Sequence, residues 1–134
     1  MSWDISIQRF SRQYASVSEI PNDEKGENLG PRLSVHRAVS AVFPDTDWSD
    51  AAWGVWESEF GSIEFNVGKD PATGMMLHVR AGPQVIPGIV RLCLDNGWQG
   101  LDCSSGEFIE QATKPQEGLA AWVAYRDQVI GKKP

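Results

Sequence analysis

The sequence contains no apolar run near the ~20 residues that a membrane-spanning helix requires. Its start, Met1–Gln8, also lacks the basic beginning and the continuous apolar core of a secretory signal. We therefore expect a cytoplasmic protein.

Cysteine is scarce as well, with Cys93 and Cys103 the only two in the sequence. Two cysteines provide no disulfide framework, and these two do not have the spacing of metal ligands. We expect both to be buried free thiols, the usual state of isolated cysteines in such a protein.

Signatures of catalysis are missing too. His36 and His78 are far apart in the sequence and do not establish a zinc site, which needs a set of well-placed ligands. Gly68–Gly74 joins two expected strands, so it lacks the strand–loop–helix context of a phosphate-binding loop. Ser104–Gly106 does not show the pattern of a nucleophile elbow. These absences predict no metal and no cofactor, and they identify no catalytic residue.

Basic residues are outnumbered, with 12 Lys and Arg against 18 Asp and Glu, for a net charge of −6. This negative net charge argues against nucleic acid and anionic membranes as partners. The excess is confined to residues 44–70, which hold seven acids and one base, while the rest of the chain holds eleven of each. The seven acids are Asp45, Asp47, Asp50, Glu57, Glu59, Glu64 and Asp70.

A chain of 134 residues can bury one core of its own, so we expect a single domain over residues 1–134. Some segments alternate apolar and polar residues, which is the pattern of half-buried strands. Others repeat apolar residues at helical spacing. The expected strands are 3–9, 53–57, 62–67, 75–80 and 98–103, with a short return at 107–109, and the expected helices are 31–43, 84–96 and 113–130.

This order predicts an α+β fold with a central antiparallel sheet of about four to six strands and about three helices. The expected order of elements is β-α-β-β-β-α-β(β)-α. Residues 45–52 form a connection in this prediction. The helices are expected to pack on one face of the sheet and to leave the other face solvated.

One polar cluster emerges when the second and third strands of the central meander pair with their apolar faces aligned. Ile63 then lies opposite Val79, and Glu64 lies opposite or diagonal to His78, with Arg80 on the same outer face. One interpretation is an acid–base pair with an arginine that holds an anion. The other is a cross-strand salt bridge on a solvated face.

The acidic stretch also carries tryptophans. Carboxylates steer a cationic partner towards a surface, and aromatic side chains anchor it there. One interpretation is therefore a binding surface for a basic protein, made of Asp45, Asp47, Trp48, Asp50, Trp56, Glu57, Glu59 and Glu64. In the other interpretation the tryptophans belong to the core and the acids serve only solubility.

Several motifs are distributed over about residues 3–110: Trp3-Asp4-Ile5-x-Ile7-Gln8, Asp47-Trp48-Ser49-Asp50 with Trp53-Gly54, Ser62-Ile63-Glu64-Phe65-Asn66-Val67-Gly68, Leu77-His78-Val79-Arg80-x-Gly82, and Gly97-Trp98 with Leu101-Asp102 and Ser105-Gly106-Glu107-Phe108. Together they resemble a family of small, acidic, uncharacterised bacterial cytoplasmic proteins. The resemblance implies no particular activity. By analogy of size, acidity and fold class, such proteins are similar to the immunity proteins that neutralise secreted bacterial toxins.

Three functions stay open at this point. The first is a non-enzymatic, immunity-like or antitoxin-like domain that occludes a basic protein partner. The second is a small enzyme or ligand-binding domain that uses Glu64, His78 and Arg80. The third is a homo-oligomeric structural protein, such as a homodimer.

Overall fold

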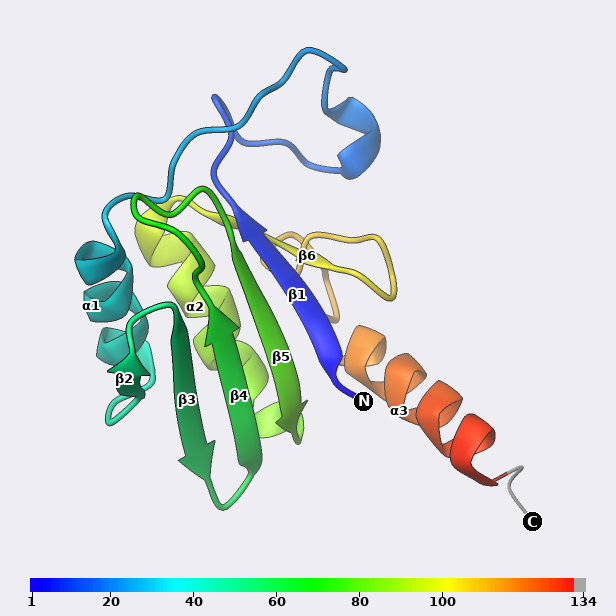
Figure 1. Cartoon of the computed structure of the whole chain (residues 1–134). Helices are drawn as coiled ribbons and strands as arrows, with labels where there is room; N and C mark the ends of the chain where they lie inside the picture. The colour runs from blue at the N-terminus through cyan, green and yellow to red at the C-terminus, as the bar shows by residue number, and fades with distance from the viewer. Residues whose placement is uncertain (132–134) are drawn as a thin grey trace.

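The alternating segments pair into one sheet of six strands in the computed structural model, which describes residues 1–131 (Figure 1). The strands are β1 (Trp3–Gln8), β2 (Asp47–Asp50), β3 (Trp53–Ser58), β4 (Gly61–Asn66), β5 (Met75–Ala81) and β6 (Gln99–Asp102). The helices are α1 (Arg32–Val42), α2 (Ile86–Asn96) and α3 (Gln116–Gly131), with short 3₁₀ turns η1 (Val17–Glu19) and η2 (Pro83–Val85). The α+β fold expected from the sequence is confirmed. Within residues 1–131, no helix combines the length and the apolar content needed to span a membrane.

The strand order is β2-β3-β4-β5-β1-β6, and every neighbouring pair is antiparallel. The N-terminal strand therefore lies inside the sheet, between β5 and β6. Strand β2 is an addition to the expected elements, because Asp47–Asp50 falls in the segment expected to be a connection. Its sequence, Asp-Trp-Ser-Asp, is too short and too polar to show alternation, and its register with β3 is irregular. The expected return at 107–109 amounts to a single bridge between Leu101 and Phe108.

Alternation decides which face of the sheet is buried. Ile63 pairs with Val79 and Phe65 with Leu77, as the sequence predicts, and at most 1% of each side chain is exposed. Helices α1 and α2 lie side by side on this face (Figure 1) and close the core. The opposite face, here called the open face, is not covered by these two helices.

The helix ends follow their local sequence. Pro31 precedes α1, where its fixed φ and missing N–H are tolerated. Pro87 lies in the first turn of α2, and Gly97 caps the other end of that helix with a φ of 67°. This left-handed conformation favours glycine, and it turns the chain so that the N–H of Trp98 bonds to the carbonyl of Cys93 at 2.9 Å.

Helix α3 is anchored mainly through its first half. Leu119 is 4% exposed, and Trp122 and Val123 are partly buried against the core. The second half extends past the end of the sheet in Figure 1, and its apolar side chains Tyr125 and Ile130 are more than half exposed.

Glu24 holds together the irregular segment between β1 and α1. Its carboxylate accepts hydrogen bonds from the hydroxyl of Ser11, from the Tyr14 hydroxyl at 2.7 Å and from the N–H of Gly26 at 3.0 Å. These bonds, led by the one from Ser11, lower the pKa of Glu24 from 4.5 to about 2, since they stabilise the charged form. The segment is thus tied to one ionised carboxylate.

We expect this segment to loosen in acid. The folded-state pKa of Glu24 is depressed, so its stabilising contribution is complete above about pH 4.5 and is lost as the pH falls towards about 2. Hydrogen exchange of the Gly26 amide, corrected for the intrinsic rate, is expected to show protection that falls through this range. Glu24→Gln is expected to reduce the protection at neutral pH and to remove its dependence on pH. Identical profiles for the two proteins would contradict this assignment.

Candidate functional site

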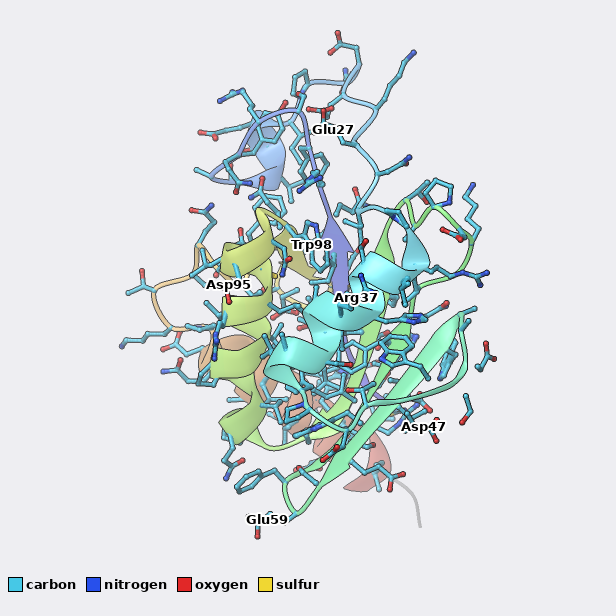
Figure 2. The ribbon with its side chains drawn as sticks, turned by 90° about the vertical axis from the view of Figure 1, so that its left-hand side faces the viewer. Glu27, Arg37, Asp47, Glu59, Asp95 and Trp98 are labelled. Carbon is cyan, nitrogen blue, oxygen red and sulfur yellow. The ribbon has the colours of Figure 1, made fainter. Side chains whose placement is uncertain are left out.

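Five exposed carboxylates gather along the flank formed by β2, β3 and the hairpin that joins β3 to β4. We call this surface the acidic edge, and its members are Asp45, Asp47, Asp50, Glu57 and Glu59. None of the five forms an ion pair with another residue in the described part of the chain. Figure 2 shows Asp47 and Glu59 on this flank, towards one end of the molecule, with Glu27 at the opposite end.

Two members of the acidic edge are also fixed in place by their own turns. The carboxylate of Asp47 accepts hydrogen bonds from the hydroxyl and the N–H of Ser49, at 2.6 and 2.8 Å. These bonds lower the pKa of Asp47, so its negative charge persists below the usual range. Asp50 accepts a hydrogen bond from the N–H of Ala52 at 2.9 Å. The charges of β2 are therefore held by short-range backbone geometry.

Glu64, assigned from the sequence to the same surface, lies elsewhere. It points to the open face and accepts a hydrogen bond from Arg80 at 2.8 Å. This ion pair neutralises its charge locally, so Glu64 does not add to the field of the acidic edge.

The two tryptophans assigned to the binding surface lie on the core side of the sheet. The ring of Trp48 stacks on His36 with a centroid distance of 3.9 Å, and its Nε1 donates to the hydroxyl of Ser40 at 3.2 Å. Trp56 contacts Phe43 edge-on at 5.0 Å. Both rings are partly buried against the core and serve packing first.

An exposed aromatic residue does stand beside the acidic edge, and the sequence interpretation did not select it. Phe60 is 44% exposed at the tip of the β3–β4 hairpin, directly after Glu59. The sequence did hold a signal for this exposure, because Phe60 stands in an expected turn beside Gly61, whose φ is 124°. A large apolar residue at a hairpin tip has no core to enter.

The polar cluster expected on the open face divides into two pairs. Glu64 lies directly opposite His78 in the ladder, as predicted, yet it bonds to Arg80. His78 instead uses its Nδ1, which lies 2.9 Å from a carboxylate oxygen of Asp4 on β1. The ring of Trp53 stacks over His78 with a centroid distance of 5.6 Å. Asp4 was missed, because the placement of β1 beside β5 is not visible in local sequence. Trp53 was missed as well, because it reaches His78 from β3, across the intervening strand β4.

This arrangement offers little to catalysis. A general acid or base works best in a concave site that excludes water. The four best-formed pockets in the described part of the chain are lined by residues other than Glu64, His78 and Arg80. Two cross-strand ion pairs on a sheet face account for these residues.

The thiols also differ from expectation. Cys93 is buried as expected, but Cys103 is exposed, since β6 ends at Asp102 and the following turn is uncovered. Burial raises the pKa of the Cys93 thiol, and partial burial with the nearby charges of Asp4 and Asp102 raises that of Cys103. Both thiols are thus protonated at neutral pH and are poor nucleophiles. The described residues include no group of three or more His, Cys, Asp or Glu placed to hold a metal ion.

A pocket of about 500 Å³ lies between the loop after β6 and the start of α3. Its buried acid, Asp102, accepts hydrogen bonds from Nε1 of Trp3 at 3.0 Å and from the N–H of Ser104 at 2.9 Å. The other carboxylate oxygen lies so close to Gly118 that a Cβ there would clash with it. Asp102 therefore ties β1 to the loop and lies against the start of α3, which is a structural role.

A second pocket, of about 460 Å³, adjoins the acidic edge and includes Glu59 and Phe60 among its lining residues. It combines a carboxylate that forms no ion pair with a described residue and an exposed aromatic side chain. Comparison with known proteins adds no assignment: the chain matches no protein-family model, no curated protein and no solved structure. The function is therefore argued from this geometry.

We expect Gly54→Ala to destabilise the β2 flank. An added Cβ at Gly54 would lie 2.6 Å from the ring of Trp48, and overpacking of this kind costs about 1–3 kcal/mol. Urea unfolding of Gly54→Ala is expected to show this loss, and the same change in a Trp48→Leu background is expected to cost less, because leucine leaves room for the methyl group. An equal penalty in both backgrounds would rule out the clash as its cause.

We expect Glu64→Gln to have a small effect on stability. The side chains of Glu64 and Arg80 are 30% and 46% exposed, and exposed ion pairs contribute less than about 1 kcal/mol. Urea unfolding is expected to show a decrease of that size which shrinks at high salt, while Glu59→Gln, which breaks no ion pair, serves as the control. A loss above about 2 kcal/mol would show that the pair is more than a surface salt bridge.

Proposed function

We propose that this chain is a cytoplasmic, non-enzymatic protein-binding domain whose acidic edge engages a basic surface on its partner. The observation that carries the proposal is the group of five exposed carboxylates on one flank, none of them paired with a described residue. Unpaired charges of one sign, gathered on one face, attract and orient a partner of opposite charge.

The charge distribution over the rest of the chain also supports attraction of a basic partner to the acidic edge. Outside residues 44–70 the chain holds eleven acids and eleven bases, so its excess charge lies wholly within that segment. Opposite charge on a partner would be drawn to the acidic edge in preference to other surfaces. Such steering acts mainly on the association rate and weakens with salt, because ions screen it over about 8–10 Å.

The position of the charges on an edge strand also favours side-chain recognition over strand pairing. Strand β2 is at the end of the sheet, where a further strand can add. Charged residues on an edge strand oppose such addition, and two of the four residues of β2 are Asp47 and Asp50. We therefore infer contact through charge complementarity.

The partner that best fits this surface is a compact basic protein whose cationic site must be covered. A bacterial toxin domain with such a site is our specific proposal, with this chain as its immunity-like or antitoxin-like inhibitor. The support is the analogy in size, acidity and α+β fold, together with the acidic edge. The open-face ion pairs and the protonated thiols favour a binding role over an enzymatic one.

We expect the double change Glu57→Lys and Glu59→Lys to weaken binding of a deca-lysine peptide by tenfold or more, about the effect of losing local steering. Neither carboxylate makes a hydrogen bond to another described residue, so the fold is expected to persist. The matched control is Asp23→Lys with Glu27→Lys, which changes the net charge equally at exposed positions between β1 and α1. Figure 2 shows Glu27 at the opposite end of the molecule from Glu59. Calorimetric titration at low and at physiological salt measures the affinity of each variant for the peptide.

Binding by the control protein is expected to remain within about twofold to threefold of the unchanged protein, because the charges it reverses are distant and screened. Equal weakening in both variants would mean that the peptide senses only net charge, and this would contradict the assignment of the acidic edge. Binding that does not depend on salt would contradict it as well.

A further inference from the structure

The pocket beside the acidic edge, here called the hairpin pocket, has a volume of about 460 Å³. Its lining residues come from the end of α1, the β3–β4 hairpin and the start of α2. It is lined by Val42, Phe43, Trp56, Ser58, Glu59, Phe60, Gln84, Val85 and Gly88.

The walls of the hairpin pocket are largely apolar and aromatic. Phe43 is 4% exposed and packs against Trp56, so this wall is held by the core. Gly88 lets α2 approach closely, because a Cβ there would lie 2.9 Å from the ring of Phe43. Phe60 also lines the hairpin pocket and is 44% exposed.

The rim of the hairpin pocket is negative. Glu59 is exposed and forms no ion pair with a described residue, and among the lining residues it is the only charged one. No Lys, Arg or His is among the lining residues. A group that enters therefore meets aromatic surface along the walls and negative charge at the mouth.

These features match the side chain of arginine better than that of any other basic residue. Its apolar stem can lie along apolar walls, while its planar guanidinium stacks on aromatic rings and bonds to a carboxylate. The compact ammonium of lysine is more strongly hydrated and lacks a planar face. Arginine is also enriched among the residues that dominate binding energy at protein interfaces.

We propose that the hairpin pocket receives an arginine side chain of the basic partner, stacked on Phe60 or Trp56 and paired with Glu59. The proposal rests on the protein-binding function above and names the chemistry of its anchor. The acidic edge attracts positive charge of either kind, and the hairpin pocket selects arginine.

The direct test is an NMR titration with N-acetyl-arginine amide and, separately, N-acetyl-lysine amide, which carry the same charge. The reporters are the indole N–H of Trp56, the side-chain amide of Gln84 and the backbone N–H of Phe60. We expect saturable shifts of these signals with the arginine probe, and binding about threefold to fivefold weaker with the lysine probe, the scale of an exposed cation–π contact.

Three variants locate the effect. Phe60→Ala is expected to bring the arginine probe down to the affinity of the lysine probe, because it removes an aromatic wall. Leu94→Ala, a matched truncation of an exposed apolar residue on α2 outside the hairpin pocket, is expected to change neither affinity. Glu59→Gln is expected to weaken both probes, since both carry a positive charge.

The outcomes separate this inference from the proposed function. Equal shifts with both probes, or shifts unaffected by Phe60→Ala, would overturn the arginine pocket even if deca-lysine binding still depends on Glu57 and Glu59. An arginine preference that Phe60→Ala abolishes would support the pocket. It would do so even if deca-lysine binding proved insensitive to those two acids, a result that counts only against the acidic edge.

Discussion

Burial of one face of the antiparallel sheet is the constraint on which the rest of the structure depends. Every second side chain of β1, β4 and β5 enters the core beneath α1 and α2, and the side chains between them are forced onto the open face. A shift of one residue in any of these strands would exchange the two sets. The positions of Glu64, His78 and Asp4 on one surface are therefore a consequence of packing on the other.

The same constraint places neighbouring side chains of β3 on opposite faces of the sheet. Along β3 the core-facing side carries Trp56, whereas Glu57 faces away, and the chain then turns at Glu59 and Phe60. The hairpin extends to where the ends of the two covering helices meet the sheet. Apolar lining from the core and the exposed carboxylate of Glu59 from the turn thus come together at the hairpin pocket. The proposed binding surface lies at the boundary between the helical layer and the sheet.

Much of the fold could be predicted, because the local periodicity of apolar residues determines the elements and their buried faces. The register of β4 against β5 follows from aligning two apolar faces, and both ends of α2 follow from Pro87 and Gly97. Strand β2 could not be predicted, since four mostly polar residues carry no period and pair only because β3 is beside them.

The candidate site was harder to predict, because it depends on long-range placement. The acidic edge follows from counting charges, but Glu64 does not belong to it, because its carboxylate bonds to Arg80. The partner of His78 is Asp4, some seventy residues away in the sequence. Trp48 was assigned to a surface although its ring packs beneath α1, against His36. Which side of a polar edge strand faces the core is decided by the neighbouring elements, and a single sequence does not show them.

The central claim is that positive charge is captured at the acidic edge, and NMR mapping of the deca-lysine contact tests it most directly. Backbone amide shifts, recorded at low salt during a titration with the peptide, report where it lies on the fold. The account predicts the largest shifts within residues 45–50 and 57–61, and their loss as salt is raised. Shifts spread evenly over all acidic segments, or strongest within residues 19–27, would contradict it.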